Sequence, residues 1–187
     1  MNTKVHFSQG KVLVFPLLQE VVTLCCTLAL FIASGRLSHP LWFSPVPIVW
    51  QVNVSLLLGA VMGVRALWVL SLALFFSLLG YPVWAGGASG WTALCGPTGG
   101  YIIGYFLGTG CIVLLKRVCL WEKKLSLYGS LLLSNLLVYA TGLLFLSHFV
   151  GWNDVLSLGF YPFLPGLFLK NILVTQCYFF LSERRIK

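Results

Sequence analysis

Charged residues are scarce in this chain, and acidic residues are scarcer still. Only 9% of its 187 residues are charged, and Asp and Glu together number four. A soluble domain carries about 25% charged residues, because its surface must be hydrated. With 59% hydrophobic residues and a mean hydropathy of +0.94, this chain is instead expected to have lipid as its main solvent.

Motifs for catalysis, metal binding and nucleotide binding are also lacking. The sequence contains no HExxH, no GxSxG, no pair of intramembrane aspartates, and no CxxC or Cys/His metal spacing. Its Gly-rich stretch 86–90 lacks the Lys-Ser/Thr ending of a phosphate loop. The 12 basic residues lie between apolar blocks instead of forming a stripe with aromatic residues. We therefore expect no enzyme, no nucleic-acid binding, no cofactor and no metal.

Long apolar blocks are what the chain does have. They cover residues 16–34, 48–64, 66–84, 97–115, 126–150 and 155–181. A spanning helix needs about 20 mostly apolar residues. The blocks therefore predict an all-α, polytopic integral membrane protein with six transmembrane helices, forming a single domain over 1–187. The last block contains Pro162 and Pro165, so its helix is expected to begin near Pro165, after a capping segment.

Basic residues predict the orientation of these helices. With the N-terminus inside, the cytoplasmic segments collect most of them: Lys4, Lys11, Arg65, Lys116, Arg117, Lys123, Lys124, Arg184, Arg185 and Lys187. The outer segments hold Arg36 and Asp154, and loop 85–96 has no charge. Because Lys and Arg accumulate on the cytoplasmic side, both ends of the chain are expected in the cytoplasm.

Small residues recur at helical spacing in two of the blocks. Gly96, Gly100, Gly104 and Gly108 would lie along one face of the fourth span, and Ala29 and Ala33 make a similar step in the first. In lipid, small residues at this spacing let helix backbones approach closely. Tight helix packing therefore explains both patterns as well as a more specific role does.

Lys170 is the polar residue that stands out, because it interrupts an otherwise apolar helix. Ionisable residues within membranes usually face the protein interior and mark a ligand or a pathway, although a lysine near a helix end also snorkels to the interface. The other polar candidates are Gln51, Asn53, Thr98, Tyr101, Asn135 and Tyr139. The uncharged loop 84–101, rich in glycine and aromatic residues, suits a lid over a small ligand.

These residues sit in blocks that resemble the BioY family, the substrate-binding S components of energy-coupling-factor transporters for biotin. The blocks are SPVPI at 44–48 with Gln51, GYPVWAGG at 80–87, GPTGGY at 96–101, and PFLPG at 162–166 with Lys170; Asn135 to Tyr139 resembles the fifth span of the family. The similarity extends from about Ala29 to Lys170.

The resemblance implies a six-helix subunit of the bacterial cell (inner) membrane that captures biotin from outside. Its expected ligand residues are Lys170, Tyr101, Thr98, Trp84, Gly86, Gly87, Asn135, Tyr139 and Gln51. From residue chemistry, Trp84, Trp91 and Tyr101 would pack the rings, Asn135 or Gln51 the ureido group, and a cation the carboxylate. Ala29 and Ala33 would dock a membrane coupling subunit, which works with two cytoplasmic ATPases.

Two positions depart from the family pattern. Leu167 stands where the family has an aspartate, three residues before the lysine, and Val49-Trp50 replaces a smaller step. An acid at 167 would have partnered Lys170. Two alternatives therefore stay open: an S-type subunit for another small carboxylated vitamin, or a membrane interaction protein that does not transport.

Overall fold

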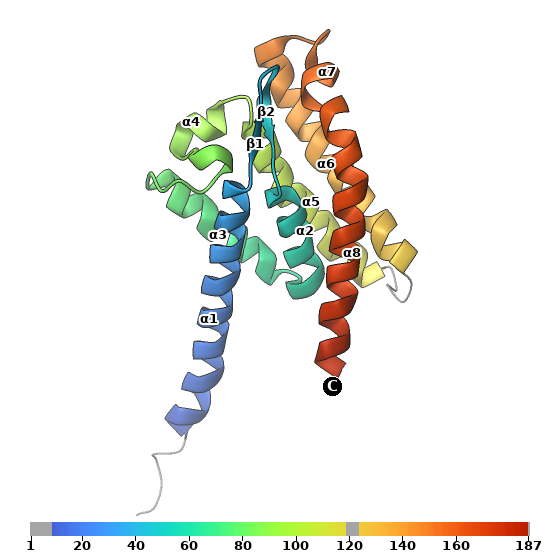
Figure 1. Cartoon of the computed structure of the whole chain (residues 1–187). Coiled ribbons are helices and arrows are strands. Elements are labelled where there is room, and N and C mark those ends of the chain that lie inside the picture. The colour runs from blue at the N-terminus through green and yellow to red at the C-terminus, as the bar shows by residue number, and fades with distance from the viewer. Residues whose placement is uncertain (1–8, 119–123, 187) are drawn as a thin grey trace, which may run out of the picture.

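The computed structural model describes residues 9–118 and 124–186, most of them in helices (Figure 1). The elements in chain order are α1 (Gln9–Arg36), β1 (His39–Leu41), β2 (Ser44–Ile48), α2 (Gln51–Met62), α3 (Arg65–Leu78), η1 (Ala85–Gly87), α4 (Gly90–Cys95), α5 (Gly99–Val118), α6 (Lys124–Val150), α7 (Val155–Gly159), η2 (Tyr161–Phe163) and α8 (Leu164–Ile186). Each expected span therefore contains one of the helices α1, α2, α3, α5, α6 and α8.

Several of these helices are long and apolar enough to cross a membrane. In the described part of the chain, four stretches qualify: Pro16–Arg36, Gly99–Val118, Lys124–Val150 and Val155–Glu183. The helices α2 and α3 are apolar but have only 12 and 14 residues. A helix of that length rises about 18–21 Å, less than the roughly 30 Å hydrocarbon core. The chain is thus a membrane protein, with two helices that do not span by themselves.

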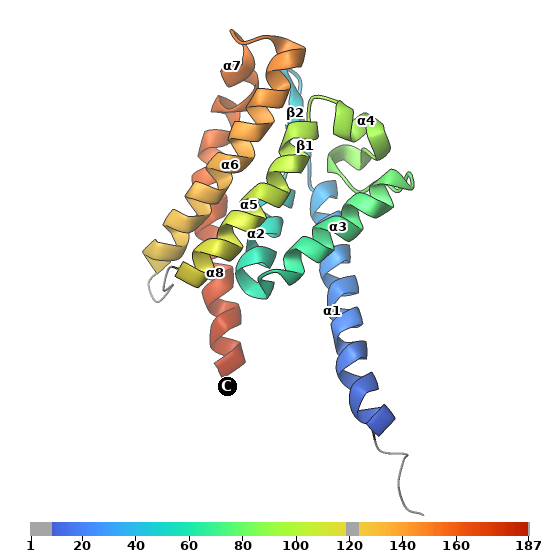
Figure 2. The ribbon, with the colours of Figure 1, turned by 180° about the vertical axis from the view of Figure 1, so that it is seen from behind.

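The path of the chain alternates between two ends of the molecule (Figures 1 and 2). From the lower end in Figure 1, α1 rises to the β1–β2 hairpin, α2 descends, and α3 rises again toward α4. The helices α5, α6 and α8 then run down, up and down, with α7 at the upper end. The start of α1 and the end of α8 consequently lie at the same end, and the lower half of α1 projects away from the other helices.

The β1–β2 hairpin corrects the all-α expectation. Its strands pair antiparallel, with His39 opposite Ile48 and Leu41 opposite Ser44. Prolines at 40, 45 and 47 prevent a helix here, since proline lacks a backbone donor and keeps the preceding residue extended. The second span therefore begins as a strand and becomes helical only at Gln51. Likewise, the third ends its helix at Leu78, before Gly80 and Pro82.

Three of the four glycines at four-residue spacing, Gly100, Gly104 and Gly108, pack α5 tightly against α6, while Gly96 lies before α5 and faces Thr92. A Cβ added to Gly104 would lie 2.8 Å from the Cα of Val138, and one added to Gly108 would lie 2.9 Å from the carbonyl oxygen of Ser134. Both distances are shorter than ordinary van der Waals contact. The expectation of close helix packing is confirmed for this pair.

The helix of the last span begins at Leu164, which confirms the expected start near Pro165. Proline at the second position costs no hydrogen bond there. The preceding residues form α7 and η2, which lie over the upper ends of α6 and α8 (Figure 1). This arrangement places Lys170 in the second turn of α8, toward the upper end.

Candidate functional site

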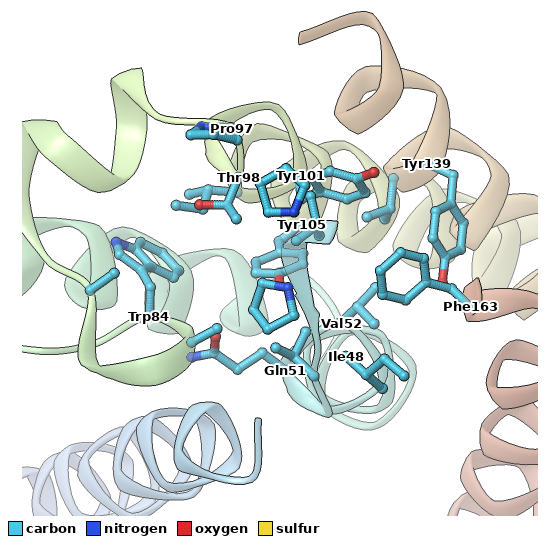
Figure 3. Close-up of a pocket in the computed structure, with 18 of the residues that line it drawn as sticks. Ile48, Gln51, Val52, Trp84, Pro97, Thr98, Tyr101, Tyr105, Tyr139 and Phe163 are labelled. Atoms are coloured by element: carbon cyan, nitrogen blue, oxygen red, sulfur yellow. The ribbon is translucent and has the colours of Figure 1, made fainter. Parts of the chain in front are cut away.

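The structure contains a cavity of about 330 Å³, shown in close-up in Figure 3. It lies among β2, the first turn of α2, the loop before α4, α5, α6 and the start of α8. Its size falls within the roughly 300–1,000 Å³ of small-molecule sites. Non-helical backbone at membrane depth is tolerated where it lines such a cavity, and residues 45–49 of the β2 segment do so.

Most of the expected ligand residues meet at this cavity. Lys170, Tyr101, Thr98, Trp84, Asn135, Tyr139 and Gln51 all border it, although they come from five separate parts of the chain. Gly86 and Gly87 do not border it; they form η1, while their neighbours Ala85 and Ala88 reach the wall. Trp91 also lies outside the lining and is 69% exposed.

Aromatic rings form two opposite sides of the cavity (Figure 3). On one side, the indole nitrogen of Trp84 donates to Ser77 Oγ at 2.7 Å, which fixes the ring against the end of α3. On the other, Tyr139 and Phe163 lie with ring centroids 6.2 Å apart. Phe163 was missed from the sequence, because nothing in the PFLPG block shows that a 3-10 turn aims its ring inward.

Tyr101 joins the two sides from α5. Its hydroxyl donates to the carbonyl oxygen of Gly159 at 2.9 Å, and its ring lies 6.3 Å from that of Tyr139. The ring packs against Gly142, where any side chain would collide with it. Tyr105 also lines the cavity. It was missed, although its position one turn after Tyr101 places it on the same helix face.

Buried side-chain amides form a polar layer at the cavity wall. Gln51 Nε2 donates to the carbonyl oxygens of Val83 (2.8 Å) and Phe31 (3.4 Å), so this amide ties α2 to α1 and to the loop before η1. Its Oε1 is buried without a hydrogen-bond partner.

A second group of amides lies between α2, α6 and α8. Asn135 Nδ2 donates to Asn171 Oδ1 at 2.9 Å and to the carbonyl oxygen of Leu131 at 3.0 Å, while Asn53 Nδ2 reaches the same Asn171 oxygen at 3.4 Å. Asn135 Oδ1 has no partner in the structure. Asn171 was missed in the sequence; its position beside Lys170 was the available signal.

Lys170 brings a positive charge to the cavity. Its ammonium donates to the carbonyl oxygen of Val49 at 2.7 Å and lies 4.9 Å from the ring centroid of Trp50. Among the described residues, the only ion pair joins Arg65 to Glu20, at the opposite end of the molecule. Leu167 borders the cavity one turn before Lys170. The cation thus faces the cavity, and no acidic side chain in the described part of the chain pairs with it.

Comparison with known proteins gives one consistent result. A family model described as the BioY family matches residues 1–185. A probable biotin transporter BioY of Pyrococcus horikoshii is 37% identical over 140 residues, which are 73% of this chain and 82% of that protein. The biotin transporter BioY of Thermotoga maritima is 35% identical over 144 residues, 72% of this chain and 79% of its own.

A solved structure extends the similarity to the fold. The S-component for biotin from an ECF-type ABC transporter superposes with a TM-score of 0.77, at 25% identity, over 96% of this chain and 95% of its own. The overall fold described above is therefore shared with that protein.

Proposed function

The chain belongs to the BioY family, and from this membership we propose that it is the biotin-binding membrane subunit of an energy-coupling-factor transporter. The observation that carries the proposal is the cavity at which Lys170, the aromatic rings and the buried amides meet. Uptake of biotin is its function, and the energy of ATP hydrolysis comes from partner subunits.

Biotin combines a fused, largely apolar ring system, a ureido group and a carboxylate tail. Trp84, Tyr101 and Tyr139 supply apolar faces for the rings, with Thr98 beside them. The amides of Asn135 and Gln51 supply hydrogen-bonding groups for the ureido, since each has an oxygen without a protein partner. A ligand that satisfies buried polar atoms is favoured over one that leaves them unpaired.

The carboxylate tail of biotin is assigned a binding site between Lys170 and the first turn of α2. Val49, Gln51, Val52 and Asn53 all border the cavity, and no side chain caps the N-terminus of α2. A helix N-terminus presents free N–H groups and the positive end of the helix dipole, which favour an anion. A carboxylate between this turn and the ammonium would receive charge-assisted hydrogen bonds from both.

The loop carrying Gly86 and Gly87 acts as the lid in this proposal. The residues from Trp84 to Thr98 supply much of one cavity wall. Ser38 Oγ accepts from the backbone N–H of Gly86 at 3.1 Å, and Arg36 donates to the carbonyl oxygen of Pro82 at 3.1 Å. These contacts hold the loop against the end of α1. Gly86 and Gly87 have φ values of +64° and +86°, which only glycine adopts readily.

The subunit is a single domain of six membrane helices in the bacterial cell (inner) membrane, with both ends in the cytoplasm. Shared placement of the start of α1 and the end of α8 supports an even number of crossings. Arg65, Lys116, Arg117 and Lys124 lie near that end, as cytoplasmic residues should. Lys4 and Lys123 lie outside the described residues, as do the side chains of Lys11, Arg184, Arg185 and Lys187.

The partners are a membrane coupling subunit and two cytoplasmic ATPase subunits. Ala29 and Ala33 support a docking role for α1, because both are exposed on a helix whose spanning stretch is only 11% buried. Small side chains in lipid allow a partner helix to approach closely.

Mass spectrometry of ligand that co-purifies with the full chain in mild detergent tests the proposal. We expect biotin, at close to one molecule per chain. Recovery of a different carboxylated vitamin would instead assign the chain to that vitamin, an alternative motivated by Leu167 in the cavity wall. Recovery of neither, together with no binding of added biotin, would contradict the proposed function.

A further inference from the structure

Trp50 lies beside the cavity cation and is not among the residues that line the cavity. The centroid of its ring is 4.9 Å from the ammonium of Lys170. We propose that Trp50 is a positioning residue for the ligand carboxylate: its ring holds the Lys170 ammonium at the cavity wall and leaves the positive charge free for the ligand. This inference rests on the function proposed above and extends it to a residue outside the binding wall.

Lys170 needs such support because its surroundings offer the cation little else. It is half-buried on an apolar face of α8, and no acidic side chain of the described residues pairs with it. Its ammonium donates a hydrogen bond to the carbonyl oxygen of Val49. An ammonium has three donors, so one carbonyl satisfies it only in part. The nearby N-terminus of α2 also disfavours a cation through the helix dipole.

The position of Val49 follows from the helix start. The backbone N–H of Val54 donates to the carbonyl oxygen of Trp50, which is thus the first acceptor used by α2. The carbonyl of Val49 lies one residue earlier and stays outside the helical ladder, available to Lys170. Proline at 45 and 47 stiffens the strand that leads to this junction. Val49 and Trp50 together therefore hold the ammonium, Val49 through its carbonyl oxygen and Trp50 through its ring.

An aromatic ring suits this position beside the ammonium better than an acid does, for one physical reason. A cation within about 6 Å of a ring centroid is attracted by the quadrupole of the ring, most strongly by Trp. The indole ring is neutral and does not ionise. A carboxylate at the same place would form an ion pair with Lys170 and compete with the carboxylate of the ligand. The ring of Trp50 attracts the ammonium without using any of its N–H donors. The donors of Lys170 that Val49 does not use therefore remain free for the ligand.

Two variants of similar size separate this role from packing. Trp50→Phe keeps an aromatic face, whereas Trp50→Met fills a comparable volume without one. Biotin and its uncharged methyl ester serve as the two ligands, measured by calorimetry on the full chain in detergent. We expect Trp50→Met to bind biotin roughly three- to thirty-fold more weakly than wild type, and Trp50→Phe within about threefold of wild type. Both variants should bind the methyl ester like wild type.

The Lys170→Met background completes the test. Once the ammonium is gone, Trp50→Met should weaken biotin binding no further, because the two residues act on the same interaction. Equal losses for biotin and the ester, equal losses in Phe and Met, or losses that add in the double variant would each overturn the proposal and leave Trp50 a packing residue. Binding of the ester by a variant also shows that it is folded. Failure of the wild-type chain to bind biotin would contradict the proposed function itself, a separate outcome.

Discussion

Gln51 Nε2 donates a hydrogen bond to the carbonyl oxygen of Val83 at 2.8 Å, although the two residues belong to different spans. The same nitrogen reaches the carbonyl of Phe31 in α1. Gly35 packs closely beside it, and a Cβ there would lie 2.5 Å from the amide nitrogen and displace the Gln51 side chain. One buried side chain thereby links α1, α2 and the loop that carries Trp84 to the cavity.

This link predicts the effect of exchanging the Gln51 amide for an acid. Gln51→Glu replaces a donor with an acceptor that faces two carbonyl oxygens, so it should lower the free energy of unfolding by about 1–3 kcal/mol. Thermal unfolding in detergent measures it. The matched control is Gln176→Glu, because Gln176 is exposed and its oxygen accepts from Lys124 at 3.0 Å. The control should be neutral or slightly stabilising; equal losses at both sites would refute the role given to Gln51.

Packing of α5 on α6 gives a second prediction. Gly104→Ala places a methyl group against the backbone of Val138 and should destabilise the protein by about 1–3 kcal/mol, the usual cost of overpacking. Gly110→Ala in the same helix is the control, since a Cβ there meets nothing within 4 Å. Its melting temperature should match or exceed that of wild type. Similar behaviour of the two variants would show that the glycine face does not set the distance between the helices.

The charge of Lys170 is expected to matter for the ligand more than for the fold. Lys170→Gln removes the cation and should weaken biotin binding by roughly ten- to a hundred-fold, the range of a hydrogen bond between charged groups. Lys124→Gln, at the opposite end of the molecule, should bind biotin like wild type. Binding isotherms for the two variants measure this difference in biotin affinity. An unchanged affinity in Lys170→Gln would show that the biotin carboxylate does not bind to Lys170.

The exposed alanines of α1 allow binding to be separated from transport. Ala29→Trp or Ala33→Trp should abolish biotin uptake by cells that hold the partner subunits, while the purified subunit still binds biotin, because a bulky side chain blocks a close helix contact. Ala140→Trp is the control, since Ala140 is exposed on α6. Loss of binding along with uptake would indicate misfolding, and normal uptake in both α1 variants would contradict docking at this face.

The sequence was sufficient for features that depend on local pattern. Long apolar blocks predicted the helices, glycines every four residues predicted the close contact of α5 and α6, and Pro165 predicted the start of α8. The hairpin was missed, because nearly all of it lies between the first two apolar blocks, where hydropathy alone predicts no element. The proline spacing was the signal that would have shown it.

The partners of individual side chains were beyond the sequence. Gln51 was a candidate ligand residue as a polar side chain in a span and a member of a block that resembles the family, yet its donor nitrogen is directed to Val83 and Phe31. Asn171 and Trp50 acquire their partners only when α2, α6 and α8 come together. Hydrogen bonds between separate helices depend on their rotation and register, which no local pattern encodes. Most of the residues that line the cavity nevertheless belong to the sequence blocks named above, because the loops and helix ends in those blocks gather at one end of the bundle.

Titration of biotin into the purified full chain, freed of any co-purified ligand, tests the account most directly. We predict saturable binding of one biotin per chain with a dissociation constant of about 1 μM or tighter, equivalent to roughly −8 kcal/mol. The same titration with the Lys170→Gln variant should show the loss expected above. An intact, folded wild-type chain that takes up no biotin at concentrations well above this value would contradict it.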